Sequence, residues 1–155
     1  MEKFIIGIQP ESVAEQIAIL LNRHNKLKKQ HTSSSILSSP TSYIISLGGN
    51  NVRHIDGEQK VIGVIGLQKT SRDVSLLHHL CVHEDFRRQG LASYLLKQGI
   101  IRCTTPLIQA HVRSDNFSSL NLCERHGFVY IQHTLAENYF ILTLGRWACD
   151  NRTKH

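Results

Sequence analysis

Two chemically reactive side chains lie on either side of a polar turn in the segment HVRSDNFSSLNLCERHGF, residues 111–128. His111 opens the segment, and Cys123 follows twelve positions later. An imidazole with a pKa near 6.5 can take up or release a proton at neutral pH, and a thiol near 8.5 can release one. The residues before the turn are typical of a strand end, and those after it of an amphipathic helix closed by Gly127. The pair is therefore either part of a catalytic site or two ordinary residues of a strand and a helix.

A second segment, CVHEDFRRQGLASYLL, residues 81–96, predicts a binding site for a phosphorylated ligand. A strand ending at Val82 leads into a helix through the residues Arg-Arg-Gln-Gly-Leu-Ala, 87–92. The first turn of a helix has N–H groups without intrahelical partners and a partial positive charge, and both favour an anion. Gly90 and Ala92 leave room for a phosphate, and the two arginines add positive charge. Alone, an arginine pair before a helix is also typical of a solvated cap.

Two other uses of these residues fit the sequence less well. A Cys–His nucleophilic dyad would need an orienting acid and an oxyanion motif, and neither accompanies His111 and Cys123. A metal site at the histidine-rich strand is also disfavoured, because His78 and His79 are adjacent and neighbouring strand residues point to opposite faces. We therefore expect no metal.

Composition indicates one globular domain, because the 155 residues are 41% hydrophobic and 19% charged. No apolar run approaches the ~20 residues of a membrane span, and the first residues lack a secretory signal. The cysteines at 81, 103, 123 and 149 are scattered, so we expect reduced thiols and a cytoplasmic location.

The net charge of +6 permits anionic partners. The lysines at 26, 28 and 29 have no interleaved aromatic residues and are typical of a solvated helix end. We therefore expect neither nucleic acid nor a membrane surface as a partner. A phosphorylated cofactor accounts better for Arg87 and Arg88.

The hydrophobic pattern predicts one mixed α/β sheet. The expected strands span 3–8, 42–47, 60–68, 73–82, 106–113, 128–134 and 138–144, and the expected helices span 11–27, 87–103 and 116–126. Residues 31–41 are rich in serine and are predicted to form a loop, either a flap or a linker. We expect a single domain over 1–155, with its core at about 3–144 and a tail at 145–155.

Both chemically suggestive segments resemble one family. VHEDFRRQGLA is similar to the acetyl-CoA-binding motif of the GNAT family of N-acetyltransferases, Arg/Gln-x-x-Gly-x-Gly/Ala, with Arg87, Gly90 and Ala92 in the defining places. Residues 111–128 resemble the segment that follows in the family, V-R-x-x-N-x-x-A-x-x-L-Y-x-x-x-G-F. The matching positions are Val112, Arg113, Asn116, Leu122, Gly127 and Phe128.

The resemblance implies an enzyme, an acetyltransferase built on a mixed, mostly antiparallel, splayed sheet of about six to seven strands with flanking helices. Acetyl-CoA would be the co-substrate, and its acetyl group would pass directly to a primary amine. Pantetheine amides would pair with backbone near Leu80 and Val82. The pyrophosphate would lie on N–H groups of Arg87, Arg88, Gln89, Gly90, Leu91 and Ala92. Asn116, also a natural N-cap, and Ser119 would add cofactor contacts, with Ser118 equally near.

The resemblance also assigns the opening pair. In some protein N-terminal acetyltransferases, the residue at the position of His111 is a histidine or glutamate that acts as a base. The position of Cys123 is usually tyrosine, the presumed acid toward the departing thiolate. Cys123 either substitutes for it or is a small buried hydrophobe, and Tyr130 or Tyr139 could serve instead.

The acceptor suggested by this similarity is a protein or peptide N-terminus. A small-molecule amine acetyltransferase and a non-catalytic acyl-CoA-binding module on the same fold remain alternatives. The positive net charge mildly disfavours a polyamine, because like charges repel. The protein would be a monomer or a homodimer.

Overall fold

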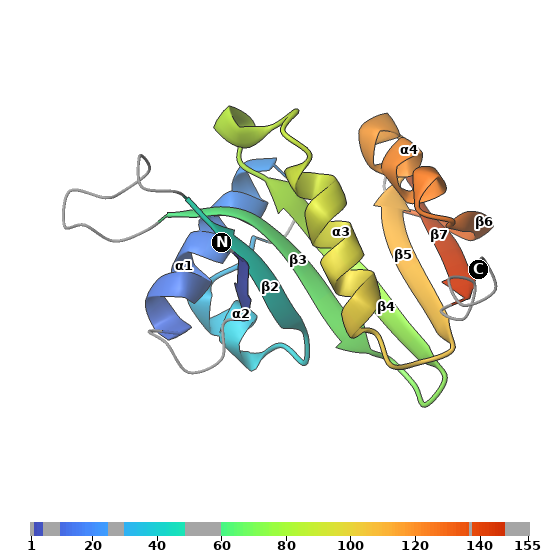
Figure 1. Ribbon diagram of the computed structural model, residues 1–155, viewed down its shortest axis with the longest axis horizontal. Helices are drawn as coiled ribbons and strands as arrows, with labels where there is room; N and C mark the ends of the chain where they lie inside the picture. Colours follow the sequence, from blue (N-terminus) through green and yellow to red (C-terminus); the bar gives the residue numbers. More distant parts are fainter. Residues whose placement is uncertain (1, 5–9, 25–29, 49–59, 137, 148–155) are drawn as a thin grey trace. The chain divides into compact units, whose positions relative to one another are not determined.

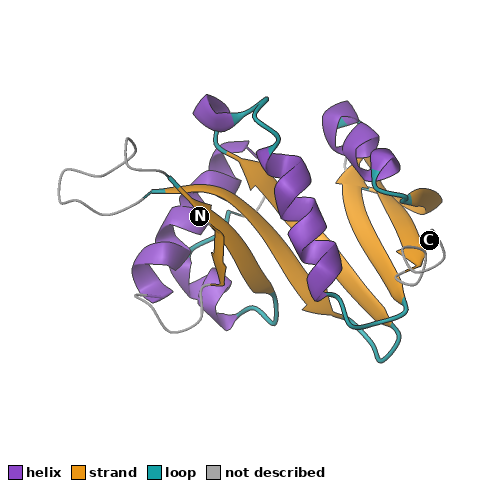
Figure 2. Ribbon diagram, in the orientation of Figure 1, coloured by secondary structure: helices purple, strands orange, loops and turns teal. Residues whose placement is uncertain are grey.

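The computed structural model describes residues 2–4, 10–24, 30–48, 60–136 and 138–147 (Figure 1). The predicted strand residues 5–8, the lysines at 26–29, residues 49–59, Cys149 and most of the predicted tail lie outside them. Figure 2 shows the helices and strands of the described part. They are β1 (Glu2–Phe4), α1 (Pro10–His24), α2 (Ser33–Ser38), β2 (Ser42–Leu47), β3 (Val61–Lys69), β4 (Val74–Val82), the 3-10 helix η1 (Glu84–Phe86), α3 (Leu91–Arg102), β5 (Leu107–Arg113), α4 (Phe117–Arg125), β6 (Val129–Leu135) and β7 (Phe140–Trp147).

The seven described strands have the order β1-β2-β3-β4-β5-β7-β6. β4 and β5 are parallel, with Val74–Leu77 beside Leu107–Ala110. The pairs β1–β2, β5–β7 and β6–β7 are antiparallel. The prediction of a mixed, mostly antiparallel sheet is confirmed.

The chain forms two compact units, and β3, β4 and α3 contribute residues to both. The first unit comprises the described residues of 1–66 and 79–98. Its core lies between α1 and the strands, with α3 on the other face of β3 (Figure 1). Gly63 permits the close approach of α3, because an added Cβ would lie 2.9 Å from Leu95 Cδ1 and 3.2 Å from Leu91 Cδ2. The buried core residues of this unit are Ala14, Ile17, Ala18, Leu20, Leu21, Ile36, Tyr43, Ile45, Val61, Val64 and Cys81.

The serine-rich segment 31–41 contains a short helix, α2, and the prediction of a loop there is wrong. Thr32 forms a capping box, in which its Oγ1 accepts from the Ser35 N–H at 3.1 Å and Ser35 Oγ accepts from the Thr32 N–H at 2.8 Å. Ile36 is the buried residue of the helix and joins the core. The only apolar residues of this six-residue helix, Ile36 and Leu37, are adjacent and give no helical periodicity, so the sequence pattern could not reveal it.

The second unit comprises residues 67–78 and the described residues from 99 onward. Here β5 pairs with the first half of β4 on one side and with β7 on the other, and β6 is an exposed edge strand. α4 ends in a Schellman motif at Gly127, whose φ is +85°. The Phe128 N–H donates to the Cys123 carbonyl and the Gly127 N–H to the Glu124 carbonyl, as the predicted C′ glycine requires.

The last strand extends beyond its predicted end at residue 144. β7 continues through Trp147, and both Gly145 and Arg146 are buried. An added Cβ at Gly145 would overlap Ile131 Cδ1, so the side chain of the neighbouring strand fills the space. A glycine and an arginine weaken the sequence signal of a strand although both belong to it.

Candidate active site

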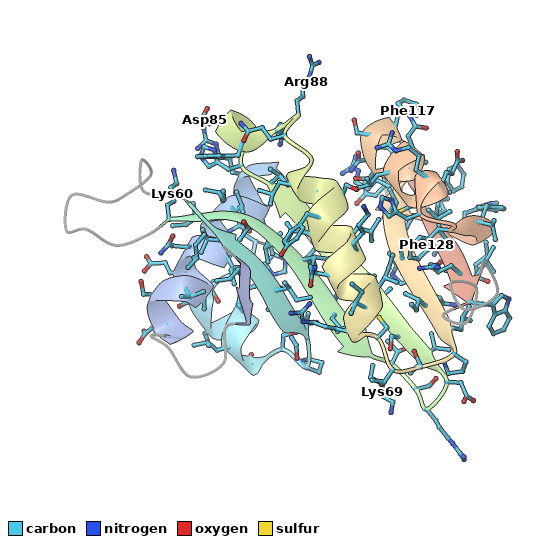
Figure 3. All side chains as sticks on the ribbon, in the orientation of Figure 1. Lys60, Lys69, Asp85, Arg88, Phe117 and Phe128 are labelled. Atoms are coloured by element: carbon cyan, nitrogen blue, oxygen red, sulfur yellow. The ribbon has the colours of Figure 1, made fainter. Side chains whose placement is uncertain are left out.

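The connection from β4 to α3, residues 83–90, is called the β4–α3 turn below. Two of its residues have left-handed backbone, Arg88 with φ +63° and Gly90 with φ +78°. The predicted helix started at Arg87, but α3 begins at Leu91, because these conformations interrupt helical geometry. Arg88 is exposed, and its side chain points away from the ribbon (Figure 3).

The start of α3 has the features of an anion site. The Gly90 carbonyl accepts the first helical hydrogen bond from the Tyr94 N–H at 3.0 Å, so the N–H groups of Leu91 and Ala92 precede the first intrahelical hydrogen bond. A Cβ built on Gly90 meets no atom within 4 Å, so open space lies beside this backbone. The residues present therefore fit a phosphate group held by backbone N–H groups.

The other predicted cofactor residues of the first unit lie in the β4–α3 turn or in the adjoining ends of β4 and α3. Arg87 folds back on the strand, where its Nε donates to the Val82 carbonyl at 3.2 Å. That carbonyl therefore already accepts one hydrogen bond from a side chain. The Leu91 side chain packs toward Gly63, which leaves its backbone for the ligand. Leu80 and Ala92 are half-buried and Gln89 is exposed.

In the second unit, Asn116 is the N-cap of α4, as its residue type predicts. Its Oδ1 accepts from the Ser119 N–H at 3.2 Å, and its carbonyl accepts from the Leu120 N–H at 3.1 Å. The Ser119 N–H is thereby engaged, and the residue is half-buried. Phe117, in the first turn, is 70% exposed (Figure 3).

His111 lies on the exposed face of β5, in register with Thr143 on β7. Ala110 and Val112, its neighbours along the strand, are buried on the other face. The part of the ring that lies against the sheet is shielded from water, and this burial lowers the pKa of His111 below its ordinary value. The imidazole is therefore mostly neutral near pH 7 and can accept a proton.

Cys123 packs against the opposite face of the same sheet. Arg146 is in register with Ile108, so both share the buried face of β5 and β7. A Cβ at Gly127 would lie 3.6 Å from Arg146 Nε, which places the end of α4 over that face. Cys123 is 3% exposed on this helix, and burial raises the pKa of its thiol to about 11. The structure does not bring His111 and Cys123 together.

The tyrosines of the last hairpin take different positions. The Arg113 guanidinium lies 3.7 Å from the centre of the Tyr139 ring and makes a two-pronged hydrogen bond to Asp115, at 3.0 and 2.9 Å. Tyr139 therefore contacts the side chain two residues beyond His111, on the same face of β5. Tyr130 pairs with Leu144, a residue of the face opposite His111, and its hydroxyl contacts His133 Nδ1.

A histidine and tyrosine cluster in the first unit was not predicted. The His79 ring stacks on Tyr43 with centroids 6.4 Å apart and meets His31 edge-on at 5.0 Å. His79 has a left-handed φ of +55°, so the alternation of faces assumed for His78 and His79 does not hold there. Burial and the neighbouring His31 lower the pKa of His79 to about 4. In the described part of the chain, no three His, Cys, Asp or Glu side chains form a metal-binding group.

The comparisons with known proteins agree with this geometry. The profile of the Acetyltransferase (GNAT) family matches residues 27–128, which include the β4–α3 turn and α4. The chain belongs to the GNAT acetyltransferase family. The prediction that it is an enzyme of this family is confirmed.

Solved GNAT-fold structures share nearly the whole fold. Ard1 from Thermoplasma volcanium is 19% identical with a TM-score of 0.69, covering 95% of this chain and 96% of its own. Arabidopsis thaliana NAA60, in complex with a bisubstrate analogue, is 14% identical with a TM-score of 0.72, covering 95% and 99%. Salmonella typhimurium yncA, with its cofactor acetyl-CoA, is 14% identical with a TM-score of 0.71, covering 97% and 94%. None of the curated proteins matches the sequence.

The described helices of this GNAT chain are all too short or too polar to cross a membrane. Its three described cysteines, Cys81, Cys103 and Cys123, are free thiols. Both observations agree with the expectations of reduced thiols and of no membrane-spanning run, and neither assigns a compartment.

Proposed function

We propose that the protein is an acetyl-CoA-dependent N-acetyltransferase that moves an acetyl group directly to a primary amine. The observation that carries the proposal is the β4–α3 turn. The family motif places Arg87 and Gly90 there and Ala92 in the first turn of α3, and the backbone at Arg88 and Gly90 opens the start of α3 toward an anion. The yncA structure, which holds acetyl-CoA, supports the same ligand.

In this proposal the chain holds the cofactor mainly with backbone. The N–H groups at residues 90–92 would take the pyrophosphate, and Arg88 would add charge at the rim. Backbone near Leu80 and Val82 would take pantetheine amides. Asn116 and Ser119 would contribute from the start of α4. When bound, the acetyl-CoA thioester supplies the acetyl group and the leaving thiolate.

The acceptor that we propose is the α-amino group of a protein or peptide. Such an amine has a pKa of about 8, so roughly a tenth of it is unprotonated at pH 7, and a weak base suffices to remove its proton. His111, exposed on β5 and largely neutral, is the candidate base. A lysine amine near pKa 10.4 would demand a stronger base.

Cys123 is a poor candidate for the acid that protonates the departing thiolate. A thiol with a pKa of about 11 is a weaker acid than an ordinary thiol near 8.5, so its proton would move uphill to the departing thiolate. Tyr139, which contacts Arg113 beside His111, is the alternative within the second unit. If no acid acts, the acyl-CoA-binding module becomes the second candidate function.

One assay separates these functions. Purified protein is mixed with acetyl-CoA and four acceptors: peptides with free N-termini, the same peptides blocked but containing lysine, a polyamine and simple primary amines. Thiol release is measured. We expect turnover with free N-termini above all others. Acetyl-CoA binding by calorimetry without thiol release on any amine would favour the module, and preference for simple amines would favour the small-molecule enzyme.

A further inference from the structure

His83 is a buried residue at the start of the β4–α3 turn. It is 5% exposed, and its backbone N–H donates to the Ile62 carbonyl of β3 at 2.7 Å. Its Nδ1 accepts from the Asp85 N–H at 3.1 Å, so the imidazole is the N-cap of η1. The ring meets Phe86 edge-on with centroids 5.8 Å apart.

The second ring nitrogen lies beside a lysine. His83 Nε2 lies 3.2 Å from Lys60 Nζ, at the start of β3. Figure 3 shows Lys60 and, on the turn itself, Asp85 and Arg88. Because Nδ1 accepts a hydrogen bond, the neutral ring carries its proton on Nε2, and both this N–H and the Lys60 ammonium are donors. His83 therefore ties the turn to β3 through its backbone N–H.

The turn needs such support because its later residues are strained. A non-glycine residue in the left-handed region costs about 1–2 kcal/mol, and Arg88 is in that region. Strained backbone persists only where the surroundings determine it. Two side chain to backbone hydrogen bonds do this here. The hydrogen bond from the Asp85 N–H to His83 Nδ1 fixes the start of the turn. The hydrogen bond from Arg87 Nε to the Val82 carbonyl holds a later part of the turn against β4.

We propose that His83 is a positioning residue for cofactor binding, which holds the β4–α3 turn in the conformation that exposes the N–H groups of α3. This inference rests on the proposed function. His83 acts through η1 and Arg87, and it does not itself touch the ligand. Its loss should lower the fraction of molecules whose turn is competent to bind, and the apparent affinity falls by that fraction.

The test compares two substitutions at this position. His83→Leu fills much of the buried volume but cannot accept from the Asp85 N–H. His83→Asn restores an acceptor of the kind that Asn116 supplies to Ser119 in the same protein. From the usual strength of an N-cap, His83→Leu should raise the Kd and KM for acetyl-CoA by about three- to tenfold, with kcat at saturation nearly unchanged. His83→Asn should recover most of the affinity.

Thr32→Ala is the matched control, because it removes the N-cap of α2 and leaves the β4–α3 turn intact. It should leave the Kd for acetyl-CoA unchanged. Amide hydrogen exchange gives a second reading that needs no ligand: His83→Leu should speed exchange at Asp85 and Phe86, and Thr32→Ala should not.

The outcomes are distinct. Normal affinity and normal exchange in a folded His83→Leu variant would overturn the proposal, and so would equal losses in His83→Leu and His83→Asn. If wild-type protein does not bind acetyl-CoA, the proposed function and the positioning role for its cofactor both fail. If wild-type protein binds but no amine is acetylated, only the transfer reaction fails. Should His83→Leu not fold, His83→Asn decides, because a loss of more than about tenfold in that variant contradicts the cap.

Discussion

His111 and Cys123 lie on opposite sides of the sheet that β5 and β7 form. His111 is exposed on β5, in register with Thr143, and Cys123 is buried between α4 and the other face. A proton that leaves an amine on the His111 side therefore has no direct route to the thiol. The two residues cannot act as a hydrogen-bonded dyad, which removes the geometric basis of nucleophilic catalysis by a Cys–His pair in this arrangement. Their roles must be tested separately.

His111→Ala should lower turnover by about 10² or more if the imidazole is the base, with the Kd for acetyl-CoA unchanged. Because burial lowers the pKa of His111, the wild-type rate should hold at pH 7 and fall only below pH 6.5, as the ring becomes protonated. The deficit of the variant should shrink toward pH 9, where the amine loses its proton unaided. Steady-state rates from pH 5.5 to 9 measure both effects.

Gln109→Ala is the control for this variant, because Gln109 precedes His111 by two residues and shares its face of β5. It should retain the wild-type pH profile. A His111→Ala enzyme with normal rates across the whole range would make the histidine an ordinary strand residue.

Cys123→Ala should leave kcat within about twofold of wild type and reduce the free energy of unfolding by about 1 kcal/mol, the usual cost of a small core deletion. The physical reason is that the buried thiol, with a pKa of about 11, is a poor proton donor and a good packing residue. Turnover with the peptide acceptor and urea unfolding are the two measurements. Tyr139→Phe, measured beside it, should show the larger loss of kcat if the hairpin supplies the acid. A Cys123→Ala enzyme that is slow yet fully stable would restore the thiol as the acid.

Both family motifs could be placed on their strands and helices from the sequence, because each depends on residue types that lie close together in the chain. The N-cap at Asn116, the glycine end of α4 at Gly127 and the strand before Arg87 follow from residue types at fixed spacing. The same local rules missed α2, where one turn offers too few apolar residues for a period.

The relations that could not be predicted are those between residues far apart in the chain. Nothing in the spacing of His31, Tyr43 and His79 shows that their rings meet, and the left-handed backbone at His79 follows from no sequence rule. The opposite orientation of His111 and Cys123 depends on which face of β5 the next helix covers. Residue types identify candidate functional residues, but the packing of helices against strands determines which of them lie close together.

Substitutions at Gly90 separate backbone strain from charge in the β4–α3 turn. Gly90→Ala adds a methyl group into open space, but its left-handed φ of +78° should cost about 1 kcal/mol or more and weaken acetyl-CoA binding moderately. Gly90→Glu adds the same strain and a carboxylate beside the expected phosphate, so its affinity should fall much further. Calorimetry with acetyl-CoA compares them, and equal losses would show that no anion lies there.

Arg88→Gly tests the other left-handed residue of the turn. It removes the strain at φ +63° and the charge together, so stability should change by no more than about 1 kcal/mol, since glycine also increases the freedom of the unfolded chain. The Kd for acetyl-CoA should rise less than in Gly90→Glu, because backbone N–H groups carry most of the proposed contact. A larger loss in Arg88→Gly would assign the phosphates to the side chain.

His79 should make folding stability depend on pH between 6.5 and 4. Its folded pKa is lowered to about 4 by burial and by His31, whereas in the unfolded chain the pKa is near 6.5. In that window the unfolded chain binds a proton that the folded chain does not, so the free energy of unfolding falls as the pH falls.

His79→Asn removes the titration and suits the left-handed backbone. Urea unfolding from pH 7.5 to 4 should show a shallower fall in this variant than in wild type. Gln109→Ala, which removes no titratable group, is the control and should leave the wild-type slope unchanged. Parallel curves for wild type and His79→Asn would mean that the ring is protonated as readily in the folded protein as in the unfolded chain.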